Sequence, residues 1–349
     1  MKSVPEDAQA PSGRGRGVLG LDGPTLARIY ALMVKARLLE ERLIKMSKGG
    51  QGFFWLGGPG EEAFNVPLGL LVKKGRGVNF DFLHLHYRSL AVLLAMGAGP
   101  ADILRQMRSA RTDPFSKGRQ FVNHPAVPDW NVVPVTPTIE TQFSTAIGTA
   151  IAQAREGGDG ITVVIGGDGG TAEGDFHSCL VWANRPALPL PILLVVTNNG
   201  WAISAPAGGQ HGEEKISYWG KVFDMPHETV DGNDPLACYN AVEKAMAYCR
   251  NRRRPYLLEA RVSRLYGHSS SSGANWAGGP DCIELLERRL LDADFLEPRK
   301  REDLWHRQRL EIDKAYASVL QEPFPAPDSI WEDVYDGPLP TAYPRRGGS

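Results

Sequence analysis

The chain has 349 residues, 42% of them hydrophobic and 23% charged, with a formal net charge of −1. This length provides one large hydrophobic core or two ordinary ones. Proteins that bind nucleic acid or membrane surfaces usually carry a strong basic excess, so the near-neutral charge argues against both partners. No stretch has the apolar length of a membrane helix or of a signal-peptide core. We therefore expect a cytoplasmic protein of bacterial type, with no transit peptide.

The ends of the chain differ from its centre in composition. Proline, glycine and polar residues dominate residues 1–21, which predicts a flexible N-terminal tail. Residues 22–320 are expected to form one α/β domain, and residues 321–349 a proline-rich C-terminal extension. The cysteines, at positions 179, 238, 249 and 282, lack the spacing of metal ligands and are too few for a disulfide framework. They are predicted to be buried thiols in a reducing compartment.

A long amphipathic helix is predicted to open the domain. Asp22 can cap it, and apolar residues recur on one side of it over residues 26–43. A glycine-rich loop with the aromatic residues Phe53, Phe54 and Trp55 follows. These three side chains fit two roles, as anchors of the core or as the lining of a substrate pocket.

Helix and strand patterns alternate through the rest of the domain. The predicted elements are helices over residues 61–71, 141–154, 172–185 and 234–250, strands over residues 161–167, 191–200 and 255–262, and a charged helical segment over residues 282–318. The strands are apolar throughout, which indicates that helices cover both faces of the sheet. This alternation is typical of a parallel sheet in an α/β domain. The basic run RNRRRP, residues 250–255, is predicted to be the solvated end of a helix.

Polar residues follow two of the predicted strands. Asp168 ends the first strand within GGDGG, and Asn199 ends the second within NNG. Adjacent parallel strands lie about 4.8 Å apart and end at one crevice, so a carboxylate and an amide can reach one Mg²⁺. Glycines let a diphosphate approach backbone N–H groups at the start of a helix. GGDGG alone would fit a plain turn, but the acidic helix start at Glu173 and Asp175 and the later NNG favour a metal and diphosphate site.

The segments GDGGTAEGDFH and TNNGWAIS, followed by VDGND, YGHSSS and EDVYDGPLP, carry a family resemblance. The chain resembles, over roughly residues 25–340, the α subunit of the thiamine diphosphate-dependent first component of 2-oxoacid dehydrogenase complexes. Its KGRQFVNHP segment, residues 117–125, is similar to the branched-chain (2-oxoisovalerate) type rather than the pyruvate type. The resemblance implies a thiamine diphosphate-binding α/β fold, with a mostly parallel central sheet flanked by helices on both faces.

The activity implied by the resemblance is oxidative decarboxylation of a branched-chain 2-oxo acid such as 3-methyl-2-oxobutanoate. The acyl group would pass to a lipoyl group on the acyltransferase component. Pyruvate and acetoin remain alternative substrates, and an inactive interaction or scaffold subunit is an alternative of another class. A nicotinamide-binding dehydrogenase fits less well, because Asp168 stands where its glycine fingerprint would admit a phosphate.

The resemblance also implies roles for single residues of the cofactor motif. Asp168 and Asn199 would be magnesium ligands, together with the main-chain carbonyl of Trp201. Gly169 and Gly170 would lie against the diphosphate of the cofactor. Together these residues would hold the diphosphate end of thiamine diphosphate.

Further family positions lie outside that motif. Tyr87 and Arg88 match a Tyr-Arg pair that binds the diphosphate, for which a guanidinium has a suitable donor fork. Pro137 and Ile139 match main-chain contacts to the pyrimidine ring, and the Ile139 side chain would keep the cofactor folded. His268 matches the catalytic histidine at the mouth of the site, where an imidazole can serve an anionic substrate or intermediate.

Partners and control are implied in the same way. The glutamate that activates the pyrimidine would lie on a separate β subunit, so we expect an α₂β₂ heterotetramer and an inactive isolated chain. A structural monovalent cation near residues Thr136 to Gln142 is a further candidate.

Thr197 departs from the arginine that branched-chain members often carry. The serine loop lacks the family's acidic pair, so we expect no kinase control at Ser269, and His177 is expected to be structural.

Overall fold

The computed structural model describes residues 20–332 and 334 of the chain. Most of the predicted N-terminal tail, and all but the first part of the predicted C-terminal extension, lie outside the described residues. The helices are α1 (Gly23–Lys48), α2 (Glu62–Leu71), α3 (Leu90–Met96), α4 (Pro100–Arg108), α5 (Thr141–Glu156), α6 (Gly174–Ala183), α7 (Trp219–Val222), α8 (Pro235–Arg252), α9 (Cys282–Asp292) and α10 (Pro298–Val319).

A parallel sheet forms the centre of the molecule, as predicted. Its strands are β1 (Phe82–His84), β2 (Thr162–Gly167), β3 (Ile192–Asn198), β6 (His227–Asp231) and β7 (Tyr256–Arg261), in the spatial order β1-β2-β3-β7-β6. Every ladder within this sheet is parallel. The unit β2–α6–β3 places β2 beside β3, with Gly167 opposite Thr197. The residues that follow these two strands are therefore neighbours at one edge of the sheet.

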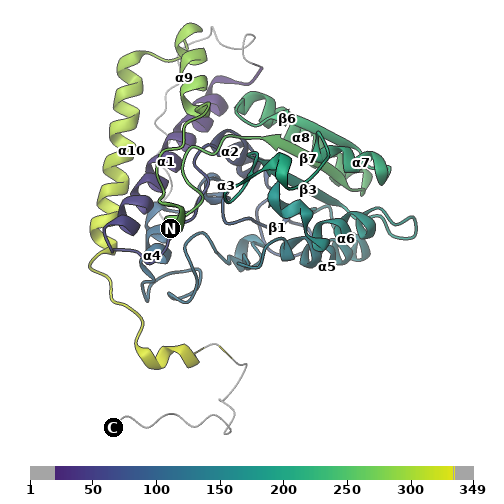
Figure 1. Cartoon of the computed structure of the whole chain (residues 1–349), viewed down its shortest axis with the longest axis horizontal. Coiled ribbons are helices and arrows are strands. Elements are labelled where there is room, and N and C mark those ends of the chain that lie inside the picture. Colours follow the sequence, from purple (N-terminus) through teal and green to yellow (C-terminus); the bar gives the residue numbers. More distant parts are fainter. Residues whose placement is uncertain (1–19, 333, 335–349) are drawn as a thin grey trace.

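Helices cover both faces of the sheet, which explains the continuous apolarity of its strands. Successive strand residues point to opposite faces. On β2, Val163 and Ile165 join a core formed with α1, α2, α3 and α8, whereas Val164 joins a second core with α5 and α6. Figure 1 shows α9 and α10 beside α1, on the side of the molecule away from α6. The predicted fold class is confirmed.

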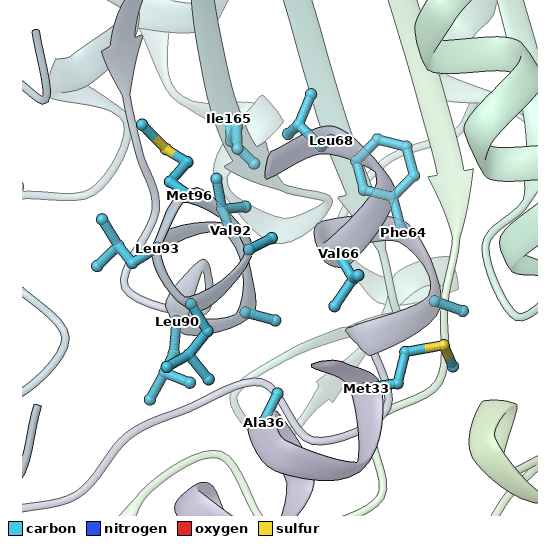
Figure 2. Close-up of a cluster of buried hydrophobic side chains, with 14 of the residues drawn as sticks. Met33, Ala36, Phe64, Val66, Leu68, Leu90, Val92, Leu93, Met96 and Ile165 are labelled. Carbon is cyan, nitrogen blue, oxygen red and sulfur yellow. The ribbon is translucent and has the colours of Figure 1, made fainter. Parts of the chain in front are cut away.

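The first core shows how the opening helix is held. Asp22 caps α1 by accepting the N–H of Thr25, as predicted. Figure 2 shows side chains of α1, α2, α3 and β2 converging on one cluster. The labelled members are Met33, Ala36, Phe64, Val66, Leu68, Leu90, Val92, Leu93, Met96 and Ile165. Burying each large apolar side chain contributes about 1.5–3 kcal/mol, so this packing fixes α2 and the loop before it against the sheet.

Several elements were not anticipated, and each has a weak local signal. Strand β1 has three residues, and β6 (HETVD) carries polar residues at a sheet edge. The charged segment over residues 282–318 is helical, as predicted, and is divided into two helices. Asp294 between them has a φ of +55°, and Pro298 begins α10. A left-handed residue ends a helix and a proline begins the next one.

The basic run at residues 250–255 is not simply solvated. It does end a helix before a strand, as predicted, because α8 ends at Arg252 and β7 begins at Tyr256. Arg250, however, donates from both terminal nitrogens to the buried Asp81 carboxylate, at 2.9 and 3.0 Å. Arg253 donates to the carbonyl oxygens of Gly160 and Gln153. The expectation of a solvated run is wrong for these two arginines, because Arg250 neutralises Asp81 and Arg253 holds the loop before β2.

All four cysteines are buried free thiols, as predicted. Burial raises the pKa of Cys179 and Cys249, which keeps these thiols protonated and unreactive. Among the described helices, none is both long and apolar enough to cross a membrane.

The imidazole of His84 on β1 is buried between two threonines of α5. Its Nε2 lies 2.9 Å from Thr149 Oγ1, and its Nδ1 lies 3.2 Å from Thr145 Oγ1. Burial lowers the pKa of His84 to about 4. The ring is therefore neutral in the folded protein near neutral pH.

We expect acid to destabilise the fold through His84. The unfolded chain protonates this imidazole below about pH 6.5. The folded chain does so only near pH 4. The stability contributed by the neutral ring is complete above pH 6.5 and is lost as the pH falls towards 4, by up to about 3 kcal/mol. His84→Gln should reduce the acid loss of unfolding free energy, measured by urea titration. A pH slope equal to that of wild type would contradict this expectation.

Candidate active site

The centre of the candidate site is the turn that follows β2. Asp168 follows the strand directly and is fully buried, and a short 3₁₀ turn runs from Gly169 to Ala172. Its Oδ1 accepts the Asn199 N–H at 3.3 Å, whereas its Oδ2 has no hydrogen-bond partner. Burial raises the pKa of Asp168, and the charge of Arg88 opposes that shift. A buried carboxylate oxygen without a partner is costly, so it indicates a ligand that the protein is built to receive.

The loop after β3 carries the other two predicted metal ligands, Asn199 and Trp201, and brings Asn199 to Asp168. Asn199 meets Asp168 through its backbone, and its side-chain Oδ1 accepts the N–H of Trp201 at 3.1 Å. Gly200 between them has a φ of +76°, which a side chain would strain. The segments that follow two adjacent strands thus carry a carboxylate, an amide oxygen and a carbonyl oxygen. These are the hard donors that Mg²⁺ prefers, and the residues present fit that ion.

The four glycines around Asp168 lie against three different groups of the protein. A Cβ on Gly166 or on Gly170 would collide with the Glu140 carboxyl group. A Cβ on Gly167 would collide with the Arg88 guanidinium, and one on Gly169 with Ala202. The missing side chains therefore admit groups of this same chain against the turn. This is an additional reason for the glycines, beyond the approach of a phosphate.

Arg88 lies against this turn within a buried network. Its Nε lies 2.6 Å from Glu61 Oε1, and its Nη1 donates to the Tyr87 hydroxyl at 3.0 Å. Glu61 begins the segment that leads into α2 and is almost fully buried. Burial raises the pKa of Glu61 to about 7, although the Arg88 charge opposes the shift. The predicted Tyr-Arg pair is thus adjacent to Asp168, with one guanidinium nitrogen over Gly167.

Three histidines surround the ring of Tyr87. His86 is stacked at a tilt with a centroid separation of 3.8 Å, His124 lies 6.4 Å away, and His268 meets the ring edge-on at 5.9 Å. Burial, followed by the charges of Arg88 and Arg264, lowers the pKa of His268 to about 4. A neutral imidazole at this place can accept a proton or donate a hydrogen bond. The structure therefore brings His268 to the Tyr-Arg pair.

The aromatic loop residues divide between the core and the surface. Trp55 is fully buried and its Nε1 donates to Glu40 at 2.7 Å, so it is a core anchor. Phe53 is 74% exposed, and Phe54 has its ring centroid 6.2 Å from that of Phe121. Of the three aromatic residues, Phe53 and Phe54 remain candidates for lining a substrate pocket.

The remaining expected residues lie in varied settings. Pro137 and Ile139 are exposed on the loop before α5, so their main chain and the Ile139 side chain are accessible. His177 packs edge-on against Trp219, in agreement with a structural role. Thr197 is buried at the end of β3. Ser269 is also buried, and its hydroxyl oxygen accepts the N–H of Ser271.

Residues 30–328 match the family model of the dehydrogenase E1 component. The chain belongs to this family. Membership of the dehydrogenase E1 component family implies dependence on thiamine diphosphate. This agrees with the unpartnered Asp168 oxygen and the adjacent guanidinium of Arg88.

The chain is also similar to several named relatives. The 2-oxoisovalerate dehydrogenase subunit alpha of Bacillus subtilis (strain 168) is 29% identical over 327 residues, 91% of this chain and 97% of that protein. The mitochondrial 2-oxoisovalerate dehydrogenase subunit alpha 2 of Arabidopsis thaliana is 29% identical over 321 residues, 89% of this chain and 66% of that protein. The mitochondrial subunit alpha of Homo sapiens is 26% identical over 319 residues, 88% of this chain and 70% of that protein.

Sequence reasoning missed four residues of this E1 site. Glu61, Glu140 and His124 carry titratable groups at or near the crevice, and Arg264 links its two loops. Arg264 donates to the Ile203 carbonyl at 2.7 Å, and its guanidinium lies 5.2 Å from the centre of the Trp201 ring. Glu61 lies at the start of the helix predicted over residues 61–71, and its local signal was the GEE after Pro59. The other three lie outside the predicted helices and strands, where no periodicity marks them.

Proposed function

We propose that this chain is the α subunit of a branched-chain 2-oxoacid dehydrogenase. It would act with a β subunit in an α₂β₂ assembly and with a lipoylated acyltransferase component. The reaction is oxidative decarboxylation of a 2-oxo acid such as 3-methyl-2-oxobutanoate, with acyl transfer to the lipoyl group. The observation that carries the proposal is the unpartnered Asp168 oxygen beside Asn199 and Trp201, in a chain that the E1 family model covers.

The side chains of the turn would bind and orient the cofactor. Asp168, the Asn199 amide and the Trp201 carbonyl would hold Mg²⁺, which in turn would hold the diphosphate. Gly169 and Gly170 would let the diphosphate approach the turn, and its short 3₁₀ segment leads into α6. Bound thiamine diphosphate supplies the nucleophilic carbon and the electron sink for decarboxylation, whereas the protein supplies orientation and electrostatics.

Arg88 would act on the diphosphate of the cofactor, and His268 would act on the substrate. The Arg88 guanidinium, fixed by Glu61 and Tyr87, would balance phosphate charge with donors that are already in place. His268 would face the substrate end of the crevice as a neutral imidazole. In that form it can donate a hydrogen bond to the substrate carboxylate or ketone oxygen and move a proton at its ring nitrogen.

The branched-chain assignment rests on the names of the relatives and on the KGRQFVNHP segment. The chain with its β subunit should therefore prefer 3-methyl-2-oxobutanoate to pyruvate. Methyl groups in an apolar pocket discriminate by about tenfold or more in kcat/KM. Decarboxylation can be followed with an artificial electron acceptor for both acids, using the co-expressed α and β chains. The isolated α chain serves as the inactive control. A strong preference for pyruvate would refute the branched-chain assignment. Activity of the α chain without a β chain would refute the proposed α₂β₂ assembly.

A further inference from the structure

Glu140 lies beneath the metal-binding turn, although it is far from that turn in the sequence. It occupies the last position before α5, has a φ of +61°, and is 1% exposed. A left-handed backbone at a glutamate is uncommon and is sustained only where surrounding contacts repay its cost. Those contacts involve the glycine-rich turn after β2.

The carboxyl group of Glu140 fits into that turn on one side. Its Oε1 accepts the N–H of Gly167 at 3.2 Å. A Cβ at Gly166 or Gly170 would overlap this carboxyl group, so both positions require glycine. Because the acceptor spans the turn on both sides of Asp168, it constrains the backbone that carries the Asp168 side chain.

Arg88 bounds the same turn from another direction. A Cβ at Gly167 would meet the Arg88 guanidinium, not Glu140, although the Gly167 N–H is bonded to Glu140. The turn is therefore held between the carboxyl acceptor of Glu140 and the cationic guanidinium of Arg88. Both have their own anchors, since Arg88 is paired with Glu61 and Glu140 begins α5. Asp168 Oδ2 accepts no hydrogen bond from either group and has no partner.

We propose that Glu140 is a positioning residue that shapes the turn at residues 166–170 so that Asp168 presents its unpartnered oxygen to the metal ion. Glu140 acts through the Gly167 N–H and through its fit against Gly166 and Gly170, and does not itself ligate the metal. The inference deepens the proposed function and rests on it. The chemistry required is a hydrogen-bond acceptor of glutamate length, which glutamine also supplies.

The test compares variants of the α₂β₂ protein in two measurements. One is the Mg²⁺ concentration that half-saturates thiamine diphosphate binding, followed by calorimetry. The other is the Tm without cofactor. Glu140→Gln keeps the acceptor and its length and should stay within about twofold of wild type for Mg²⁺. Glu140→Ala removes the acceptor and should raise the half-saturating concentration by about tenfold or more.

A double variant separates the effect of Glu140 on Mg²⁺ binding from its effect on packing and Tm. Gly170→Ala alone displaces the Glu140 carboxyl group and should weaken Mg²⁺ binding as Glu140→Ala does. In Glu140→Ala with Gly170→Ala, the added methyl group fills part of the vacated space, so the Tm should recover while the Mg²⁺ requirement stays raised. The matched control is Glu40, a buried glutamate that accepts from Trp55 and Gly58 away from the turn. Glu40→Ala should lower the Tm and leave the Mg²⁺ requirement unchanged.

Three results would overturn the proposal. One is a Glu140→Ala protein that binds Mg²⁺ and cofactor like wild type with only a lowered Tm. Another is a Glu140→Gln protein as impaired as Glu140→Ala, because that would make the charge and not the acceptor decisive. The third is recovery of Mg²⁺ binding in the double variant. A wild-type protein that fails to bind thiamine diphosphate would instead refute the proposed function, so the two failures are distinguishable.

Discussion

Asp168→Ala should abolish Mg²⁺-dependent binding of thiamine diphosphate while leaving the fold intact. The substitution removes the carboxylate of the proposed metal site. It should cost little stability, because it breaks only the long bond from the Asn199 N–H, while Asp168 Oδ2 has no partner and burial disfavours the charged carboxyl group. Loss of one such bond costs about 1 kcal/mol, which the removal of the unpartnered oxygen offsets. Calorimetry with Mg²⁺ and cofactor tests the first part, and thermal unfolding without cofactor tests the second.

Asp81 provides the matched control for that experiment. It is also a fully buried aspartate beside the sheet, but Arg250 pairs with both of its oxygens. Asp81→Asn should lower the Tm and leave cofactor affinity close to wild type. If Asp168→Ala bound cofactor normally, or if its Tm fell as far as that of Asp81→Asn, the proposal of a metal site at the ends of β2 and β3 would be wrong.

Replacing Arg88 should damage stability and cofactor binding together. Arg88→Met leaves the Glu61 carboxyl group buried without its partner and near Asp168. Breaking a buried pair on one side costs about 3 kcal/mol or more. The variant also loses the fixed donors proposed for the diphosphate. We expect a clear fall in Tm and at least about a hundredfold weaker binding of thiamine diphosphate, which corresponds to two charge-assisted hydrogen bonds.

A second substitution separates the two effects of Arg88. Adding Glu61→Leu to Arg88→Met replaces the whole ion pair by apolar groups of similar size, which is often neutral for stability. The double variant should regain most of the Tm of wild type and still bind cofactor weakly. Recovery of cofactor affinity along with the Tm would show that Arg88 acts only by supporting the fold.

The local pattern of the chain was sufficient for the central unit. Strands β2 and β3 are continuous apolar runs, and helix α6 between them carries apolar residues at core spacing, so their type and order could be predicted. Parallel pairing with a short crossover then requires that Asp168 and Asn199 emerge at one edge. The contact between them, a 3.3 Å bond to the Asp168 carboxylate, agrees with that reasoning. Short edge strands such as β1 and β6 carry too few residues for a comparable signal.

The sequence by itself determined the residue types of the proposed metal site, because its expected ligands follow two strands whose spacing is set by the sheet. Only the tertiary structure decided what surrounds them. Glu140 and Gly167 are 27 positions apart in the chain, and no local period connects them. Their contact depends on how the loop before α5 packs against the turn after β2. The place of Glu61 beside Arg88 depends on how the start of α2 meets the segment after β1. The glycines around Asp168 had suggested room for a phosphate, and the packing shows that they also admit a carboxyl group and a guanidinium of the protein itself.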